Sequence, residues 1–247
     1  MTIPRFPLPD GQPIHGRIIL SGNPFRHLVK VLRAKPGDKV FFYDREGYEY
    51  PSTVEHISRY EAICMSDQRI EKGKEPYQKI ILFQGLLKKE KMDLLIQKAT
   101  ELGVYKIIPI ITERSQVKLR DEKIDSRIRH WERIAEAATS QSRRNFIPLI
   151  EPPKLFKKAI LELKPEYANL FLSENVQERN LKEIIRKLKS AKQISIMVGP
   201  PGGFTDKEVI AAEEKGLYVI SLKGTILRSE TAAISILSIV QYEFGNL

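Results

Sequence analysis

The stretch LKGTILRSETAA (Leu222–Ala233) lies near the end of the chain, between an apolar run and a segment that favours a long helix. Gly224 permits a backbone turn that other residues rarely adopt. A run of polar residues then begins at Arg228 and continues to the start of the helix. Ordinary loops rarely need such a run, so this junction between strand and helix is a candidate site.

The chain before this stretch alternates between strands and helices from residue 79 onward. Helices are expected at 87–102 and 121–142, and Thr205 and Glu208 form a capping box for another helix that ends at Gly216. Buried strands are expected at KIILFQG (79–85), KIIPII (106–111), ANLFLSE (168–174), ISIMVG (194–199) and YVISL (218–222). This alternation predicts an α/β fold in which helices cover both faces of a parallel sheet.

Three loops follow consecutive strands of this predicted sheet: LSEN (172–175), GPPGGF (199–204) and LKGTILR (222–228). Parallel sheets bind ligands at the carboxyl ends of their strands, so we expect the three loops to line one pocket. The sequence has neither the G-x-G-x-x-G dinucleotide fingerprint nor a phosphate-binding P-loop. Backbone groups and small or apolar side chains therefore favour an uncharged, adenosine-like ligand.

The first seventy residues instead suggest short strands and one helix. Strands are expected at 16–20, on both sides of a hairpin turn at 45–47, and at 52–57 and 62–67. The helix, at 23–32, is expected to begin with Asn23 as its cap. The polar segment RIEKGKEP (69–76) is the best linker candidate. We predict a small β-barrel domain at 1–72 and an α/β domain at 77–247.

The charge of the chain favours a polyanionic partner. The 247 residues include 41 Lys and Arg against 31 Asp and Glu, a net charge of +10. Residues 1–40 alone contain seven basic and two acidic residues. Such an excess can serve solubility only, but its concentration in one segment favours nucleic acid, which basic residues bind through phosphate contacts.

Other functional classes have little support. No apolar run approaches the roughly 20 residues of a membrane helix, and the first residues do not resemble a signal peptide. The single cysteine, Cys64, excludes an internal disulfide framework and points to the cytoplasm. Four scattered histidines and one cysteine have no metal-ligand spacing, and no G-x-S-x-G elbow is present. We therefore expect neither a metal site nor a membrane segment.

Longer motifs resemble the RsmE family of the SPOUT methyltransferases. They are GPPGGF and LKGTILRSETA together with HLVKVLR (27–33), ATELGVYKIIPIITERS (99–115) and QSRRNFIP (141–148). The resemblance covers nearly the whole chain. It implies a SPOUT-type parallel sheet with a carboxyl-terminal trefoil knot, preceded by a small PUA-like β-barrel that binds RNA. It also implies a homodimer that methylates N3 of a uridine in 16S ribosomal RNA of the small subunit, using S-adenosylmethionine.

The resemblance also assigns roles to residues of the three loops. The family usually has glutamate where this chain has Pro201, so any contact of that carboxylate is in doubt here. The residues expected to bind the cofactor are Leu172, Ser173, Glu174, Val198, Gly199, Pro200, Gly202, Gly203, Leu222, Lys223, Gly224, Ile226, Leu227 and Ala232.

Catalysis and RNA binding are assigned to polar residues. Uracil N3 carries a proton that must leave, so Glu230 is a candidate base and Arg228 a candidate for stabilising the uracil anion; an ion pair or helix cap is the alternative for both. The residues expected to contact RNA are Arg5, Arg33, Arg114, Gln141 and Arg143. Two other functions stay open: a non-catalytic RNA-binding or ribosome-assembly protein, and methylation of another RNA base or of a ribose hydroxyl.

Overall fold

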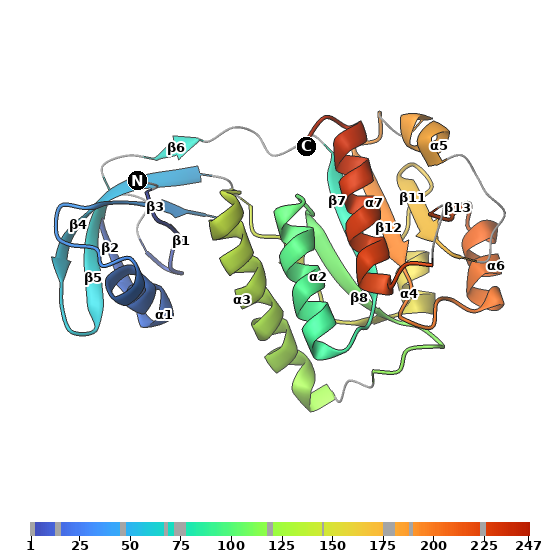
Figure 1. Cartoon of the computed structure of the whole chain (residues 1–247), viewed down its shortest axis with the longest axis horizontal. Coiled ribbons are helices and arrows are strands. Elements are labelled where there is room, and N and C mark those ends of the chain that lie inside the picture. Colours follow the sequence, from blue (N-terminus) through green and yellow to red (C-terminus); the bar gives the residue numbers. More distant parts are fainter. Residues whose placement is uncertain are drawn as a thin grey trace. The chain divides into compact units, whose positions relative to one another are not determined.

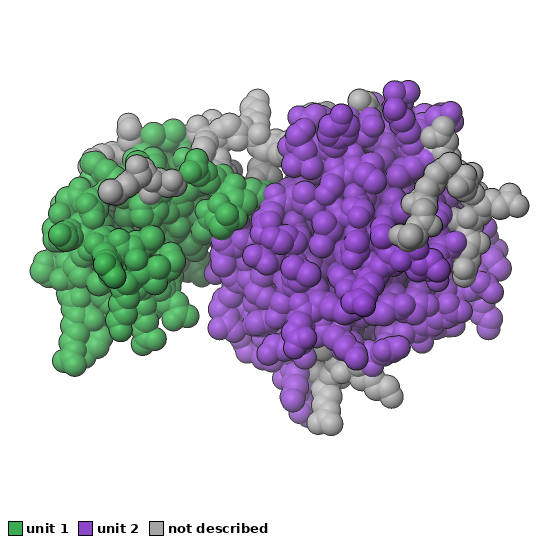
Figure 2. Space-filling model, in the orientation of Figure 1, with its two compact units in different colours: residues 1–75, 139–147 green, residues 76–138, 148–247 purple. Residues whose placement is uncertain are grey.

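A computed structural model shows two compact units, which Figure 2 distinguishes by colour. Unit 1 comprises residues 1–75 and 139–147, and unit 2 comprises residues 76–138 and 148–247. Residues 139–147 fall within the predicted domain 77–247, whereas the structure groups them with unit 1. The structure describes residues 3–12, 16–44, 48–66, 69–71, 78–117, 121–144, 146–174, 181–187, 190–222 and 226–247.

Unit 1 is built on a six-stranded sheet with the order β1-β3-β4-β5-β2, in which β6 pairs with β4. The pair β1–β3 is parallel and the others are antiparallel. In the described pairings β1 and β2 are the two edge strands of this sheet, and its closure into the predicted small β-barrel stays a prediction. The strands are β1 (Arg5–Pro7), β2 (Gly16–Ser21), β3 (Lys39–Tyr43), β4 (Tyr48–Ile57), β5 (Glu61–Ser66) and β6 (Ile70–Glu71).

Two local predictions in unit 1 need correction. The strand expected at 52–57 is only the second half of β4, which continues through Pro51 because this residue lies opposite Phe41 within the β3–β4 pair. The expected linker 69–76 begins with β6. The hairpin turn expected at 45–47 lies outside the described residues.

The predicted helix of unit 1 exists but is built differently. It starts as α1 (Gly22–Arg26), with Ser21 and not Asn23 at the cap position, and continues as the π-helical turn η1 (His27–Val31). Arg33 then has a φ of 54°, in the left-handed region. The helix buries Phe25 and Leu28 among the apolar side chains of the sheet, which form the core of unit 1.

Unit 2 has the predicted parallel sheet (Figure 1). Its strand order is β10-β8-β7-β12-β11-β13, with β9 beside β8, and every described pair is parallel. The two short strands β9 and β10 were not predicted. The strands are β7 (Lys79–Gly85), β8 (Lys106–Ile111), β9 (Leu149–Ile150), β10 (Lys154–Leu155), β11 (Ala168–Leu172), β12 (Gln193–Val198) and β13 (Tyr218–Ile220).

Helices cover both faces of this sheet, as predicted. On one face, α4 and α6 pack on apolar side chains of the strands, including Phe83, Phe171 and Met197. On the other face, α7 contacts α2, α5 and β12 (Figure 1). No helix among the described residues is long and apolar enough to cross a membrane. The helices are α2 (Lys89–Glu101), α3 (Ile124–Ser142) after the short η2 (Asp121–Lys123), α4 (Phe156–Leu161), α5 (Leu181–Lys187), α6 (Asp206–Glu214) and α7 (Ser229–Glu243).

The register of the strands brings their carboxyl ends to one level. Leu172 of β11 lies opposite Val198 of β12 and Ile220 of β13. On its other side, Val198 lies opposite Gln84 of β7. The loops that follow β11, β12 and β13 therefore leave the sheet next to one another.

Candidate functional site

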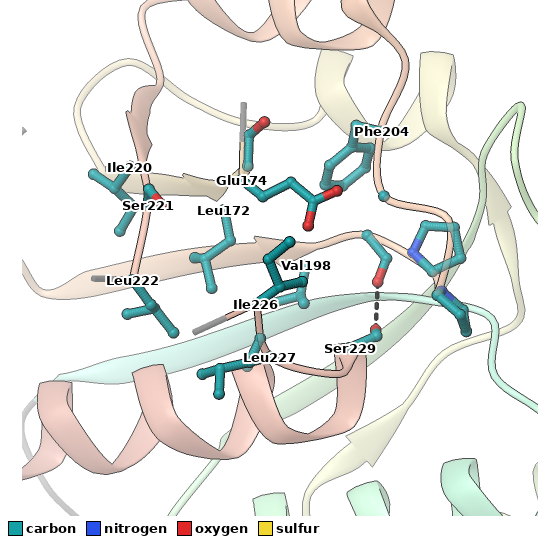
Figure 3. Close-up of a pocket in the computed structure, with 16 residues that line it drawn as sticks. Leu172, Glu174, Val198, Phe204, Ile220, Ser221, Leu222, Ile226, Leu227 and Ser229 are labelled. Carbon is teal, nitrogen blue, oxygen red and sulfur yellow. Dashed lines mark hydrogen bonds between the residues drawn. The ribbon is translucent and has the colours of Figure 1, made fainter. Parts of the chain in front are cut away.

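A cavity of about 210 Å³ lies at the carboxyl ends of β11, β12 and β13 (Figure 3). All three predicted loops contribute to its wall, so their expected convergence is confirmed. Glu174 is the one ionisable residue among the described residues that line it. The lining residues are Leu172, Ser173, Glu174, Val198, Gly199, Pro200, Pro201, Gly203, Phe204, Ile220, Ser221, Leu222, Ile226, Leu227, Ser229 and Ala232.

Most residues expected to bind a cofactor lie in this wall. Gly202 belongs to the same loop but is not among the lining residues, and Lys223 and Gly224 lie outside the described residues. The expected residues that line the cavity are Leu172, Ser173, Glu174, Val198, Gly199, Pro200, Gly203, Leu222, Ile226, Leu227 and Ala232.

Five lining residues were not assigned from the sequence: Pro201, Phe204, Ile220, Ser221 and Ser229. Pro201 and Phe204 lie in GPPGGF, Ser229 lies in LKGTILRSETA, and Ser221 directly precedes that motif, so the motifs were the available signal for these four residues. Ser229 belongs to the stretch that first suggested a site. Its hydroxyl donates a hydrogen bond to the Gly199 carbonyl oxygen, shown as the dashed line in Figure 3.

The loop after β12 needs glycine at Gly199 because of close packing and at Gly203 because of its backbone conformation. A Cβ atom on Gly199 would lie 3.1 Å from the Gly203 carbonyl carbon and 3.1 Å from the Phe204 ring. Gly203 has a φ of 67°, which L-residues rarely adopt, and its N–H donates to the Pro200 carbonyl oxygen at 2.8 Å. The backbone of this loop therefore forms part of the cavity wall directly.

The end of the loop is fixed by the predicted capping box. Thr205 caps α6, and the buried Glu208 Oε2 accepts a hydrogen bond from the Thr205 N–H at 2.9 Å. Glu208 Oε1 accepts a second bond from the Glu113 N–H at 3.1 Å, in the loop after β8. The same carboxylate thus holds two loops of unit 2 together.

Arg114, in the loop after β8, reaches the outer side of the loop after β12. Its Nη1 donates to the Gly202 carbonyl oxygen at 3.0 Å, and its side chain is exposed. A Cβ atom on Gly202 would lie 3.3 Å from the Arg114 Cβ, so this position favours glycine for a packing reason.

Neither residue that was assigned to catalysis lines the cavity. Arg228 is exposed at the N-cap position of α7, directly after the lining residue Leu227. Glu230 has a side chain only 9% exposed, and its Oε1 lies 3.0 Å from Lys91 Nζ of α2. Of the two alternatives for Glu230, an ion pair is therefore present, although its partner is Lys91.

The residues of unit 1 that were assigned to RNA have different environments. Arg5 is 6% exposed in its side chain, forms an ion pair with the buried Glu49, and lies 5.4 Å from the centre of the Tyr43 ring. Arg33, Gln141 and Arg143 are exposed.

Arg33 and Arg143 share an uncommon backbone conformation. Their φ angles are 54° and 60°, values at which glycine is usually favoured. Each follows the end of a helical segment, and the N–H of the next residue bonds back to a helical carbonyl oxygen, that of Leu28 or of Thr139. Both arginines therefore lie exposed just after the end of a helical segment.

Metal binding and thiol chemistry receive no support from the described residues. They contain no group of three or more His, Cys, Asp and Glu side chains that could hold a metal ion. Cys64 is a core residue of unit 1, and this burial, with a smaller contribution from Glu55, raises the pKa of its thiol to about 11.

Comparison with known proteins matches both parts of the chain. A family described as RNA methyltransferase domain matches residues 74–241, and one described as RNA methyltransferase PUA domain matches residues 20–64. Ribosomal RNA small subunit methyltransferase E of Mesomycoplasma hyopneumoniae is 32% identical over 89% of this chain and 92% of its own length.

Two solved structures are similar over the whole chain. Ribosomal RNA small subunit methyltransferase E of Neisseria gonorrhoeae, bound to S-adenosylmethionine, is 30% identical, covers 98% of both chains and has a TM-score of 0.88. A structure from Legionella pneumophila, in complex with the bound cofactor S-adenosylmethionine, is 29% identical over 98% of both chains, with a TM-score of 0.90.

Proposed function

The chain belongs to the RsmE family of RNA methyltransferases, and we propose that it transfers a methyl group from S-adenosylmethionine to N3 of a uridine in small-subunit (16S) ribosomal RNA. The observation that carries this proposal is the cavity at the carboxyl ends of β11, β12 and β13. Two similar proteins were solved with S-adenosylmethionine bound, and this cavity offers a site of fitting chemistry.

The lining of the cavity suits this cofactor. Apolar side chains such as Leu172, Val198 and Ile220 provide contacts for an adenine ring, and backbone groups beside them can recognise its edge. The Glu174 carboxylate has the charge opposite to that of a sulfonium. Pro201 lines the cavity where the family usually has glutamate, and Glu174 is the one carboxylate among the described lining residues.

Methylation at uracil N3 requires loss of the N3 proton and stabilisation of the resulting anion. When bound, the cofactor supplies an electrophilic methyl group, so the main tasks of the chain are to position the base and stabilise its charge. We assign Arg228, exposed beside Leu227 of the cavity wall, to hydrogen bonding with a uracil carbonyl oxygen. We assign Glu230 to the ion pair with Lys91 and leave the proton acceptor unassigned.

For RNA binding, we propose that the exposed Arg33, Arg114, Gln141 and Arg143 contact the substrate. Arginine pairs with phosphates and stacks on unpaired bases, and the target uridine must be unpaired or flipped out. We assign Arg5 to the stability of unit 1, because its guanidinium is buried against Glu49.

The remaining properties are proposed from family membership. They are a PUA-like domain at 1–72, a methyltransferase domain at 77–247, a carboxyl-terminal trefoil knot, a homodimer, and action on the small ribosomal subunit in the cytoplasm. Knots are rare, and this one is proposed from family membership. The bond between Ser229 and Gly199 shows only that the segment entering α7 lies against the loop after β12.

The direct test is methyl transfer from labelled S-adenosylmethionine to small subunits that lack the modification, with the product nucleoside identified by mass spectrometry. We expect 3-methyluridine, and we expect Arg228→Ala to reduce the rate by about a hundredfold. Transfer to another position would change the assigned target. Cofactor binding without transfer to any RNA would favour a binding or assembly role. The reason to consider this role is that the chain has Pro201 where the family usually has glutamate.

A further inference from the structure

Gln84, at the end of the central strand β7, is completely buried and was not assigned a role from the sequence. Its side-chain amide lies among groups from three separate parts of unit 2. Nε2 donates to the Gly85 carbonyl oxygen at 3.0 Å, to Ser229 Oγ at 2.9 Å and, more weakly, to the Gly199 carbonyl oxygen at 3.5 Å. The last two partners are 145 and 115 residues away in sequence.

Ser229 completes this network and connects it to the cavity. Its hydroxyl accepts a hydrogen bond from Gln84 and donates one to the Gly199 carbonyl oxygen. Ser229 and Gly199 both line the cavity, whereas Gln84 lies behind them. The network therefore joins the first turn of α7 to the loop after β12 through the end of β7.

Close packing at the same place leaves little freedom for these segments. A Cβ atom on Gly85 would lie 2.3 Å from the Pro200 nitrogen, so the loop after β12 rests directly on the end of β7. Hydrogen bonds in such a buried site strongly define geometry, because an unpaired buried polar group is costly.

We propose that Gln84 is a positioning residue for the cofactor pocket, which holds the loop after β12 and the start of α7 at the separation that the cofactor requires. This inference rests on the proposed function, since it concerns the same site. The orientation of the amide follows from its neighbours: two carbonyl oxygens, which only accept hydrogen bonds, lie near Nε2. A carboxylate at this position would face them with no hydrogen to donate.

The structure therefore predicts an order of effects that side-chain size alone does not. Gln84→Met keeps the length of the side chain but removes the donor, and we expect the Kd for S-adenosylmethionine to rise about tenfold. Gln84→Glu is closer in size to glutamine, yet we expect a larger rise because its oxygens face two carbonyl groups. In steady-state kinetics, KM for the cofactor should rise more than kcat falls, and KM for RNA should not change.

Asn169 provides a matched control. It is also a buried amide on a strand of this sheet, its Nδ2 donates to a backbone carbonyl oxygen at 2.9 Å, and it does not line the cavity. Asn169→Leu should lower the melting temperature about as much as Gln84→Met and change the cofactor Kd less than twofold. An equal loss of cofactor affinity in both variants would overturn the proposal, because it would show a general effect of stability.

A double-mutant cycle with Ser229→Ala tests the network itself. Ser229→Ala alone should weaken cofactor binding, and adding Gln84→Met should then cause a smaller loss than it causes in the unaltered protein, because the bond between the two side chains is already gone. Independent, additive losses would contradict the network. Ser229→Ala also keeps the proposal testable if the Gln84 variants do not fold.

Hydrogen exchange in the free protein separates this inference from the proposed function. Gln84→Met should speed exchange in residues 199–204 and in the first turn of α7, whether or not the protein binds S-adenosylmethionine. Unchanged exchange there would overturn the role of Gln84. Absence of cofactor binding by the unaltered protein would instead refute the proposed function and leave the exchange result to decide on the network.

Discussion

The cavity of unit 2 and the basic amino-terminal segment of unit 1 (residues 1–40) are built from different chemical groups: backbone and apolar groups in the cavity, charged side chains in the segment. The cavity is formed largely by backbone and apolar groups whose positions follow from strand order and register. In the basic segment, two residues of the same type have opposite surroundings: Arg5 is buried against Glu49, whereas Arg33 is exposed. A site made by sheet topology can therefore be located from sequence more safely than one made by side-chain charge.

The largest expected effect tests the buried arginine. Arg5→Met should destabilise unit 1 by about 3–5 kcal/mol, because it breaks the ion pair between the Arg5 guanidinium and the buried Glu49 carboxylate. The double variant Arg5→Met, Glu49→Leu should recover most of this loss, and Arg33→Met should have little effect. Calorimetric unfolding of the variants measures these differences. Equal stability of Arg5→Met and Arg33→Met would remove the contrast between the two residues.

A smaller effect is expected where the cavity depends on close backbone packing. Gly85→Ala places a Cβ atom 2.3 Å from the Pro200 nitrogen and should cost about 1–3 kcal/mol, with loss of S-adenosylmethionine binding. Gly216→Ala is the control: its φ is 79°, and no atom lies within 4 Å of the added carbon. It should cost about 1–2 kcal/mol from backbone strain alone and leave the cofactor Kd unchanged. Calorimetric titration distinguishes the two, and equal cofactor affinities would contradict the packing argument.

The smallest effect separates charge from backbone strain at Arg33. Arg33→Gly should be more stable than Arg33→Ala by about 1 kcal/mol, because its φ of 54° suits glycine. Both variants should bind RNA more weakly, and the slope of log affinity against log salt should become smaller by about one. Arg33→Lys keeps the charge and should keep the slope. An unchanged slope in Arg33→Ala would show that Arg33 does not contact phosphate.

The sequence was sufficient for features that depend on local pattern. Alternating apolar segments predicted the main helices of unit 2 and all its strands except the short β9 and β10, and the Thr205–Glu208 spacing predicted the capping box. The convergence of the three loops followed from the rule that parallel strands end at one edge.

Features that depend on distant partners could not be predicted in this way. Periodicity indicates which face of a helix is buried, but it does not indicate that Glu230 meets Lys91, or that Gln84 meets Ser229. The π-helical turn of η1 has the same apolar spacing as an α-helix, so its sequence did not distinguish them. The cap at Ser21 makes no side-chain hydrogen bond and thus leaves no pattern to recognise.

The central claim, that the cavity binds S-adenosylmethionine, is tested most directly by filling it. Ala232 on α7 lines the cavity, whereas the preceding Thr231 is exposed and does not. Calorimetric titration should show that Ala232→Phe no longer binds S-adenosylmethionine, while Thr231→Phe binds with the affinity of the unaltered protein and both variants remain folded. Binding of the cofactor to folded Ala232→Phe with unaltered affinity would contradict the account and place the cofactor elsewhere.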